Sequence, residues 1–220
     1  MNLGRNFLTC FFRVAILLLL ACGTAAATGD PTNATIAWAD LGSRATAQYS
    51  GDGLAVTLSP SGAVRLRCTF QQLEGEVTGD GLWLSSTVAD GAGVPSRRFR
   101  VVADAVGREG GAVKMLPLSG AASGGTATAC FRRPGLVEEY SVSVDGVRQD
   151  FVVAAPPAGA GDLRVELAVS GARAGLDAAV AQLVLEGSGR RLSYSRLHVA
   201  DATGRVRLGA HLNRRVEVPL

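Results

Sequence analysis

Histidines, acidic residues and aromatic rings are the side chains of this sequence best suited to catalysis or ligand binding. The two histidines, His198 and His211, lie in neither an H-E-x-x-H nor an H-x-H pattern, so no histidine-based metal motif is present. Glu74 and Glu76 would share one face of a strand, with Cα atoms about 6.6 Å apart at roughly 3.3 Å per residue. Glycosidases use paired carboxylates at comparable distances. Exposed strand glutamates are common, however, so we predict no catalytic, metal or cofactor site.

Five large aromatic residues are candidates for stacking on a sugar ring: Trp38, Tyr49, Trp83, Tyr140 and Tyr194. The two tryptophans are the preferred candidates. Trp83 lies within Leu82–Leu84 and faces opposite to both leucines if this segment is a strand. If the leucines point into the core, the indole lies on the outer surface of the sheet, where a flat ring can stack on a pyranose. Trp38 is the second candidate. The alternative for both rings is burial between two layers of the fold.

Four cysteines are present, and their positions predict that two are removed with the N-terminal segment and two remain in the folded region. Cys10 and Cys22 fall in the N-terminal apolar segment, which leaves Cys68 and Cys130 for the folded region. In an oxidising compartment these two could form a disulfide closing a loop of about 60 residues, which would stabilise by roughly 4 kcal/mol. The alternative is a pair of buried thiols that pack as small apolar groups.

Residues 1–27 have the pattern of an export signal. Arg5 and Arg13 precede an apolar core at Val14–Ala21, and the small residues Ala25–Ala27 suit a signal peptidase. The core is about 8 residues long, too short for a membrane-spanning helix of about 20. Leu19–Cys22 also resembles a lipobox, in which Cys22 would be lipidated. We therefore predict a secreted or cell-surface protein without a membrane span in its mature chain, released after Ala27 or anchored through Cys22.

Loss of the signal changes the charge balance of the chain. The full sequence has 22 basic and 19 acidic residues. Because Arg5 and Arg13 leave and no acid does, the mature chain keeps 20 basic residues against the same 19 acids. A nearly neutral chain gives no electrostatic reason to bind nucleic acid or an anionic membrane.

Alternation of apolar and polar residues predicts an all-β fold after residue 34. Val64–Phe70, Tyr140–Val144 and Leu163–Val169 each alternate with period two, and Asp-Gly pairs such as Asp145-Gly146 supply tight turns. We expect a hairpin from Glu139–Val144 to Val147–Val153. Alanines give Gly175–Leu185 some helix propensity, but it lacks a good cap, so a strand is favoured.

The strand spacing predicts antiparallel sheets packed as a β-sandwich, either one large sandwich or two smaller ones. Residues 154–161 contain two prolines and two glycines, so strand pairing must lapse there. This stretch either separates two domains or crosses over within one. We predict a signal peptide at 1–27, a β-sandwich domain at 28–155 and a second β-region at 156–220.

The C-terminal third of the chain resembles a known kind of module. Glu138–Phe151 reads EEYSVSVDGVRQDF, Pro157–Leu167 reads PAGAGDLRVEL, and Ser188–Leu197 followed by Asp201–Arg205 extends the pattern. This layout is similar to the N-terminal leader module of large exported bacterial cell-surface proteins, where it precedes seven-bladed β-propeller repeats. The resemblance covers residues 136–209. It implies an extracellular β-module with no catalytic residues and with C-terminal repeats as its partners.

No such repeats follow in this sequence, which ends after another apparent strand at Val216–Leu220. The chain is therefore interpreted either as a truncated leader or as a short relative. The favoured function is a non-enzymatic structural or adhesive module at the bacterial cell surface. The alternatives are a carbohydrate-binding module that contacts surface polysaccharide and, more distantly, an extracellular hydrolase.

Overall fold

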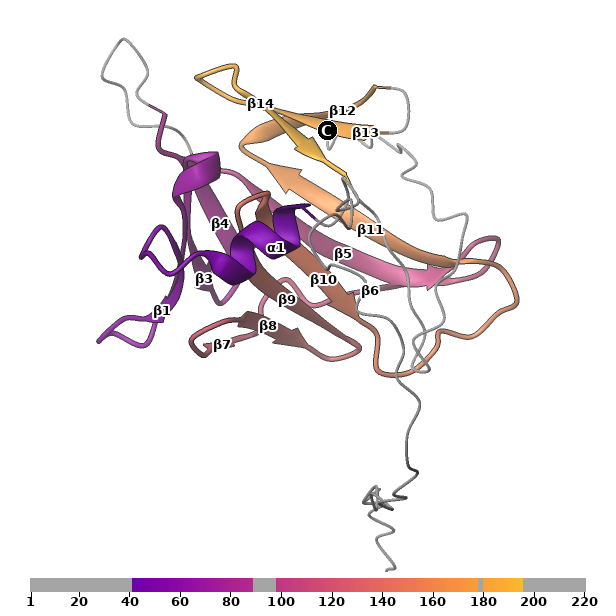
Figure 1. Ribbon diagram of the computed structural model, residues 1–220. Helices are drawn as coiled ribbons and strands as arrows, with labels where there is room; N and C mark the ends of the chain where they lie inside the picture. The colour runs from indigo at the N-terminus through magenta and orange to yellow at the C-terminus, as the bar shows by residue number, and fades with distance from the viewer. Residues whose placement is uncertain (1–40, 89–97, 178–179, 196–220) are drawn as a thin grey trace, which may run out of the picture. The chain divides into compact units, whose positions relative to one another are not determined.

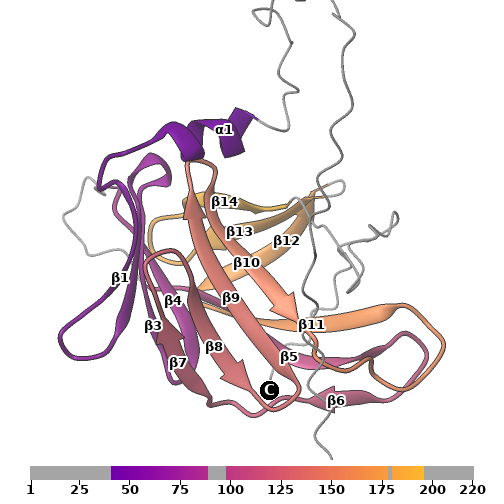
Figure 2. The same cartoon turned by 60° about the horizontal axis from the view of Figure 1, so that its bottom comes forward.

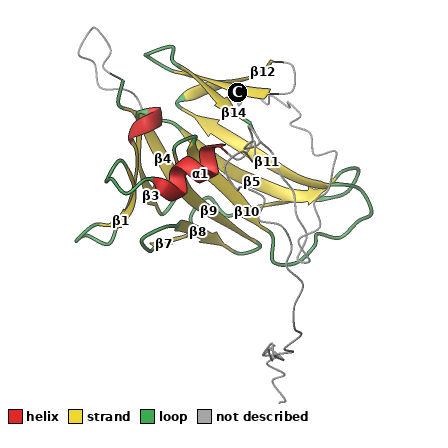
Figure 3. Cartoon of the chain, viewed as in Figure 1, coloured by secondary structure: helices red, strands yellow, loops and turns green. Residues whose placement is uncertain are grey.

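The computed structural model describes residues 41–88, 98–177 and 180–195 (Figure 1). These residues form antiparallel β-sheets with one short α-helix, α1 (Leu41–Gln48), and one 3₁₀ turn at Thr69–Gln71 (Figure 3). The predicted all-β class is confirmed. Within the described ranges, no helix has the length and apolar character needed to cross a membrane.

The first sheet is a meander of four neighbouring strands. They are β1 (Leu54–Leu58), β2 (Val64–Cys68), β3 (Leu73–Thr78) and β4 (Gly81–Ser86). Strand β2 shows why this segment folds as a strand: Val64, Leu66 and Cys68 are buried, whereas Arg65 and Arg67 are exposed. This is the alternation that the sequence predicts.

The second sheet has the order β10-β9-β8-β7. Its strands are β7 (Ala121–Gly124), β8 (Ala129–Arg133), β9 (Leu136–Ser143) and β10 (Gly146–Val152). The predicted hairpin is confirmed, since β9 and β10 pair from Ser143 and Gly146 outward. Gly146 has a φ of 136°, a backbone conformation that glycine adopts without steric cost.

Two further sheets have three strands each. One has the order β11-β5-β6, from β5 (Arg100–Arg108), β6 (Val113–Met115) and β11 (Leu163–Ser170). The other has the order β12-β13-β14, from β12 (Ala172–Asp177), β13 (Val180–Leu185) and β14 (Arg191–Tyr194). The described part of Gly175–Leu185 is therefore strand, as predicted.

The proline-containing stretch at 154–161 connects β10 to β11. Strand β11 follows this stretch and pairs with β5, so one sheet joins residues from both sides of position 155. Arg108 at the end of β5 holds the connection, because its guanidinium donates to the carbonyls of Pro157 at 3.1 Å and Gly161 at 2.9 Å.

Apolar residues from the β1–β4 and β7–β10 sheets share one core cluster. Val64, Leu66 and Val77 from the first sheet lie in the same buried cluster as Phe131 and Tyr140 from the second. Figure 2 shows strands β7–β9 in front of β3 and β4. Burial of each large apolar side chain contributes roughly 1.5–3 kcal/mol, so this shared core holds the two sheets together.

A two-residue bridge links the first sheet to β5. Leu84 and Phe99 exchange backbone hydrogen bonds of 2.8 Å in both directions. The turn between β11 and β12 lies close to this bridge: a Cβ added to Gly171 would fall 2.1 Å from the carbonyl oxygen of Arg98. Gly171 also has a φ of 70°, so the turn requires glycine for two independent reasons.

Candidate functional site

Trp83 lies on the outer surface of the first sheet. Leu82 on one side of it is 4 % exposed and belongs to the core, and Leu84 packs against the same cluster. Alternation along β4 therefore directs the indole away from the core, as the sequence analysis anticipated for core-facing leucines. Glu76 is the residue paired with Trp83 across β3 and β4.

The indole of Trp83 is already engaged by charged side chains. The guanidinium carbons of Arg100 and Arg98 lie 4.8 and 5.3 Å from its ring centroid, within cation–π range. Its Nε1 donates to Asp80 Oδ2 at 3.2 Å, and Arg100 donates to the Asp80 carbonyl oxygen at 2.7 Å. The Thr78 hydroxyl lowers the pKa of Asp80 most, with further lowering from the Trp83 N–H and the Arg100 charge.

These contacts limit what Trp83 can bind. A sugar ring that stacked on an indole face covered by Arg98 or Arg100 would displace that guanidinium, and Trp83 is half-buried. The ring pair present among the described residues lies elsewhere and does not include Trp83. The other predicted stacking residue, Trp38, and the predicted lipidation residue, Cys22, lie outside the described residues.

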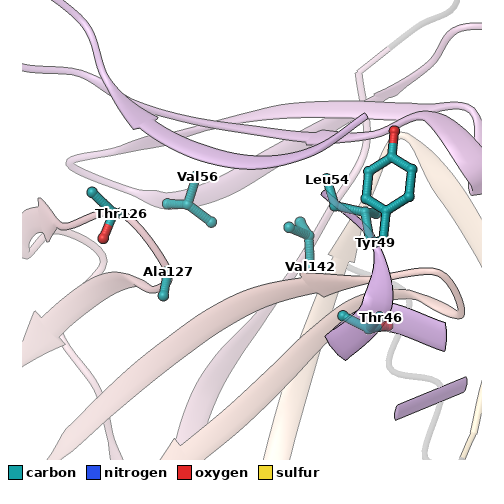
Figure 4. Close-up of a pocket in the computed structure, with 7 residues that line it drawn as sticks. All are labelled: Thr46, Tyr49, Leu54, Val56, Thr126, Ala127 and Val142. Atoms are coloured by element: carbon teal, nitrogen blue, oxygen red, sulfur yellow. The ribbon is translucent and has the colours of Figure 1, made fainter. Parts of the chain in front are cut away.

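A groove of about 180 Å³ lies between β1 and β9 (Figure 4). Its apolar lining comes from Leu54 and Val56 of β1, Val142 of β9 and Ala127 in the turn between β7 and β8. Polar atoms lie at both ends of the groove, where the remaining lining residues are Thr46, Tyr49 and Thr126. The Tyr49 hydroxyl accepts a hydrogen bond from the Gly53 N–H at 3.1 Å, so its own proton remains available for donation.

An exposed aromatic pair adjoins this groove. Tyr49 and Phe70 are 37 % and 51 % exposed, and their rings meet edge to face with centroids 5.1 Å apart. Tyr49 is one of the aromatic residues that the sequence suggests for stacking, whereas Phe70 and the pairing were missed because the two residues lie on opposite sides of the β1–β2 hairpin. The signal that was present is an aromatic residue just before β1 and another just after β2.

The end of the groove is built around the tip of the β9–β10 hairpin. The Thr46 hydroxyl of α1 accepts from the Val144 N–H at 3.1 Å, and Gln71 Nε2 donates to the Val144 carbonyl at 3.0 Å. The Cys68 thiol lies 3.2 Å from the Ser143 carbonyl oxygen. Helix α1 is thereby fixed to the hairpin, which sets the position of Tyr49.

A buried polar network lies in the interior, and sequence reasoning missed it. Glu138 is fully buried and accepts hydrogen bonds from the Ala103 N–H at 3.1 Å, the Tyr140 hydroxyl at 2.9 Å and Gln149 Nε2 at 2.6 Å. It also forms an ion pair with Arg133, which is itself 6 % exposed. The Gln149 side chain in turn accepts from the Tyr194 hydroxyl at 3.3 Å.

Burial sets the titration behaviour of this network. It raises the pKa of Glu138, against the opposing effects of Tyr140, Gln149, Arg133 and the Ala103 N–H. Burial and the nearby Glu138 charge also raise the pKa of Tyr140. Tyr140 therefore stays protonated and acts as a donor. An enclosed carboxylate surrounded by four donors has no open side for a substrate.

The two glutamates that have glycosidase-like spacing lie on the outer surface. Glu74 forms an ion pair with Arg67 at 3.2 Å, and both side chains are about half exposed. Glu76 lies opposite Arg65 on one side and Trp83 on the other. Within the described ranges, no cluster of three histidine, cysteine or acidic residues is suited to holding a metal ion. His198 and His211 lie outside those ranges.

Of the two alternatives for Cys68 and Cys130, the disulfide is not formed. Cys68 and Cys130 are both free thiols. Cys68 is fully buried in a core cluster with Leu73 and Phe99. Cys130 lies between Ala129 and Phe131, both fully buried, so alternation along β8 directs its side chain to the opposite, partly exposed face. The two thiols therefore face different environments, and burial raises the pKa of Cys68.

Comparison with known proteins gives no relative for this chain: no family model, no curated protein and no solved structure matches it.

Proposed function

We propose that this chain is an exported, non-enzymatic β-module with a structural or adhesive role at the bacterial cell surface. The observation that carries the proposal is the position of Glu138, which is fully buried and bonded to side chains or backbone of β5, β8, β9 and β10. A catalytic carboxylate must reach the proton that it transfers. This carboxylate instead joins strands of two sheets, which suits a cohesive module.

In this proposal the β1–β4 and β7–β10 sheets are the two layers of a β-sandwich. The shared core of Val64, Phe131 and Tyr140 supports that arrangement. The segment Glu138–Phe151, which resembles a surface-protein leader, supplies most of β9 and β10 and thus the centre of the module. Residues 1–27 direct export, with release after Ala27 favoured over lipidation at Cys22.

Export and surface exposure can be tested with the full chain carrying a C-terminal epitope tag in a bacterial host. We expect mass spectrometry to find a mature N-terminus at Thr28, and protease added to intact cells to remove the tag. The matched control is Leu18→Arg, which interrupts the apolar core of the signal and should leave the chain unprocessed. An unprocessed, protease-resistant wild-type chain would contradict the proposal.

The Tyr49–Phe70 pair favours a second candidate function, carbohydrate binding. Both rings are exposed, and the lining of the adjoining groove includes the hydroxyl-bearing residues Tyr49 and Thr126. Aromatic rings beside such groups are suited to a pyranose, which has apolar C–H faces and polar edges. In this candidate the stacking surface lies at Tyr49 and Phe70 and not at Trp83.

Affinity electrophoresis of the full chain through gels containing soluble polysaccharides distinguishes the two functions. If the module binds sugar through this pair, Phe70→Ala should abolish the retardation by a polysaccharide, whereas Trp83→Ala should leave it intact. Loss of retardation with Trp83→Ala alone would relocate the site to the outer surface of β4. No retardation by any polysaccharide would leave the structural or adhesive role as the better-supported function.

A further inference from the structure

Strand β1 has an unpaired edge that differs from the other edges in the described residues. It pairs with β2 on one side only. The backbone N–H of Thr69 bonds to the Gly53 carbonyl, and that of Ser59 bonds to the Ala63 carbonyl. Because hydrogen-bonded pairs alternate along an antiparallel ladder, the odd-numbered residues of β1 bond to β2. The N–H and C=O groups of Leu54, Val56 and Leu58 therefore point away from β2.

The side chains of β1 give this edge no protection. Edge strands commonly carry charged residues, prolines or bulges that prevent pairing with another chain. Strand β1 reads Leu-Ala-Val-Thr-Leu and pairs with β2 without a register shift. Its last residue, Leu58, is 61 % exposed.

The other described edges are blocked or unsuitable. Charged residues lie on β6, β10, β11, β12 and β14, namely Lys114, Arg148, Asp150, Arg164, Glu166, Arg173 and Arg191. Strand β7 has only small side chains. The outer edge of β4 is continued by its bridge to Phe99.

We propose that β1 is a self-association edge, at which β1 of a second copy of this chain pairs antiparallel with it about Val56. The apolar inner-face positions of β1 are symmetric about that residue, because Leu54 and Leu58 lie two residues to either side of it. Antiparallel pairing centred on Val56 places Leu54 of each copy opposite Leu58 of the other, and Val56 opposite its own counterpart. Each of these three pairs would exchange two backbone hydrogen bonds, because all of their free groups point toward the partner.

Charge and apolar contact both favour a second copy of this chain as the partner that pairs with the free edge of β1. On the outer face the pairing brings Ala55 opposite Thr57, so no like charges meet at the junction. On the inner face the exposed Leu58 gains an apolar neighbour, Leu54, which lines the groove. The two β1–β4 sheets would then continue into each other across the junction.

The small area of the β1–β1 contact determines how tightly the two copies are expected to bind. A pairing of two five-residue strands buries less than the roughly 1,200 Å² typical of stable interfaces, so the dimer should be weak. We expect a dissociation constant on the order of 100 µM. Concentration-dependent dimerisation in that range is the measurable consequence.

Sedimentation velocity of the purified full chain, from about 10 µM to 1 mM, tests this directly. Leu58→Pro removes one outward N–H per copy while leaving the bonds to β2 in place. The symmetric dimer loses this bond twice, so the dissociation constant should rise roughly thirtyfold. The matched control is Leu118→Ala, which truncates a leucine that is 82 % exposed outside β1 and should leave the constant unchanged.

Amide hydrogen exchange provides a second measurement that does not depend on any variant folding. Dimerisation through β1 predicts that the amides of Val56 and Leu58 become protected as concentration rises, while Ala55 and Thr57 are protected throughout. A chain that stays monomeric at 1 mM would overturn the proposal. A dimer that Leu58→Pro does not weaken would also overturn it. The same holds if the Val56 amide becomes protected only when a synthetic peptide copying residues 53–59 is added, because the chain itself would then not pair through β1.

Discussion

At the scale of single residues, Glu138 and Arg133 have the greatest influence on the interior. Both are buried, and Glu138 also satisfies donors from Tyr140 and Gln149. Removing one member of such a pair leaves a charge without a partner in a low-dielectric environment. The energetic effect of the pair is therefore a coupling between its members and not a property of either residue alone.

A double-mutant cycle measures that coupling. We expect Glu138→Gln and Arg133→Met each to lower the free energy of unfolding by about 3–5 kcal/mol. The double variant should lose less than the sum of the two, by about 2 kcal/mol or more, because no unpaired charge remains. Urea unfolding followed by circular dichroism gives the values.

The exposed pair Arg67–Glu74 is the control for this cycle. Both of its side chains are about half exposed, so Arg67→Met and Glu74→Gln should each change stability by no more than about 1 kcal/mol. Strictly additive losses at Glu138 and Arg133 would show that the two residues act independently.

At the scale of the elements, period-two alternation predicted where the strands lie. It did not predict which strands pair with each other in the sheets. The faces of β2 and the β9–β10 hairpin follow from apolar spacing and from Asp145-Gly146, both of which are local signals. The pairing of β5 with β11 joins residues separated by the whole β7–β10 sheet, so no local pattern specifies it. The buried role of Glu138 was missed because the Ala103 N–H that it accepts from is on β5, 35 residues away, and because its local donors Arg133, Tyr140 and Gln149 do not by themselves indicate burial.

The turn between β11 and β12 gives a prediction at this scale. Gly171→Ala should destabilise the chain by about 2 kcal/mol or more, because the new Cβ would meet the Arg98 carbonyl and the positive φ is unfavourable for alanine. Gly175→Ala in β12 is the matched control, since an added Cβ there meets nothing within 4 Å. Thermal unfolding of both variants compares them, and an equal response would contradict the proposed requirement for glycine.

At the scale of the whole molecule, Arg190 makes polar contacts that link the β12–β14 sheet to the first sheet. Arg190 donates to the carbonyl oxygens of Gln71 and Gln72 at 2.7 and 3.0 Å and to the Ser86 hydroxyl at 2.7 Å. Apolar contact comes from Leu183 and Leu185, which share a core cluster with Leu73.

Arg190→Met should therefore loosen this sheet without unfolding the rest. We expect faster amide hydrogen exchange across β12–β14 and little change in β8 and β9. Arg191→Met is the neighbouring control, because Arg191 is exposed on the edge strand β14 and has no hydrogen bond to the first sheet among the described residues. Uniformly faster exchange over the whole chain would indicate that Arg190 supports global stability instead.

The long separation between β5 and β11 also has a consequence for how the chain folds. The β1–β4 meander and the β9–β10 hairpin form from neighbouring segments, so they can form early. Strand β5 must wait until β11 has been synthesised, some 55 residues later, and the closure of that long loop slows folding. During this interval β5 can pair with β6 but its β11-facing edge is unpaired in a partly folded chain, and such strand edges are prone to aggregation. If the chain is exported as proposed, delayed folding would protect it, because β5 would meet β11 only after the whole sequence had left the cell interior.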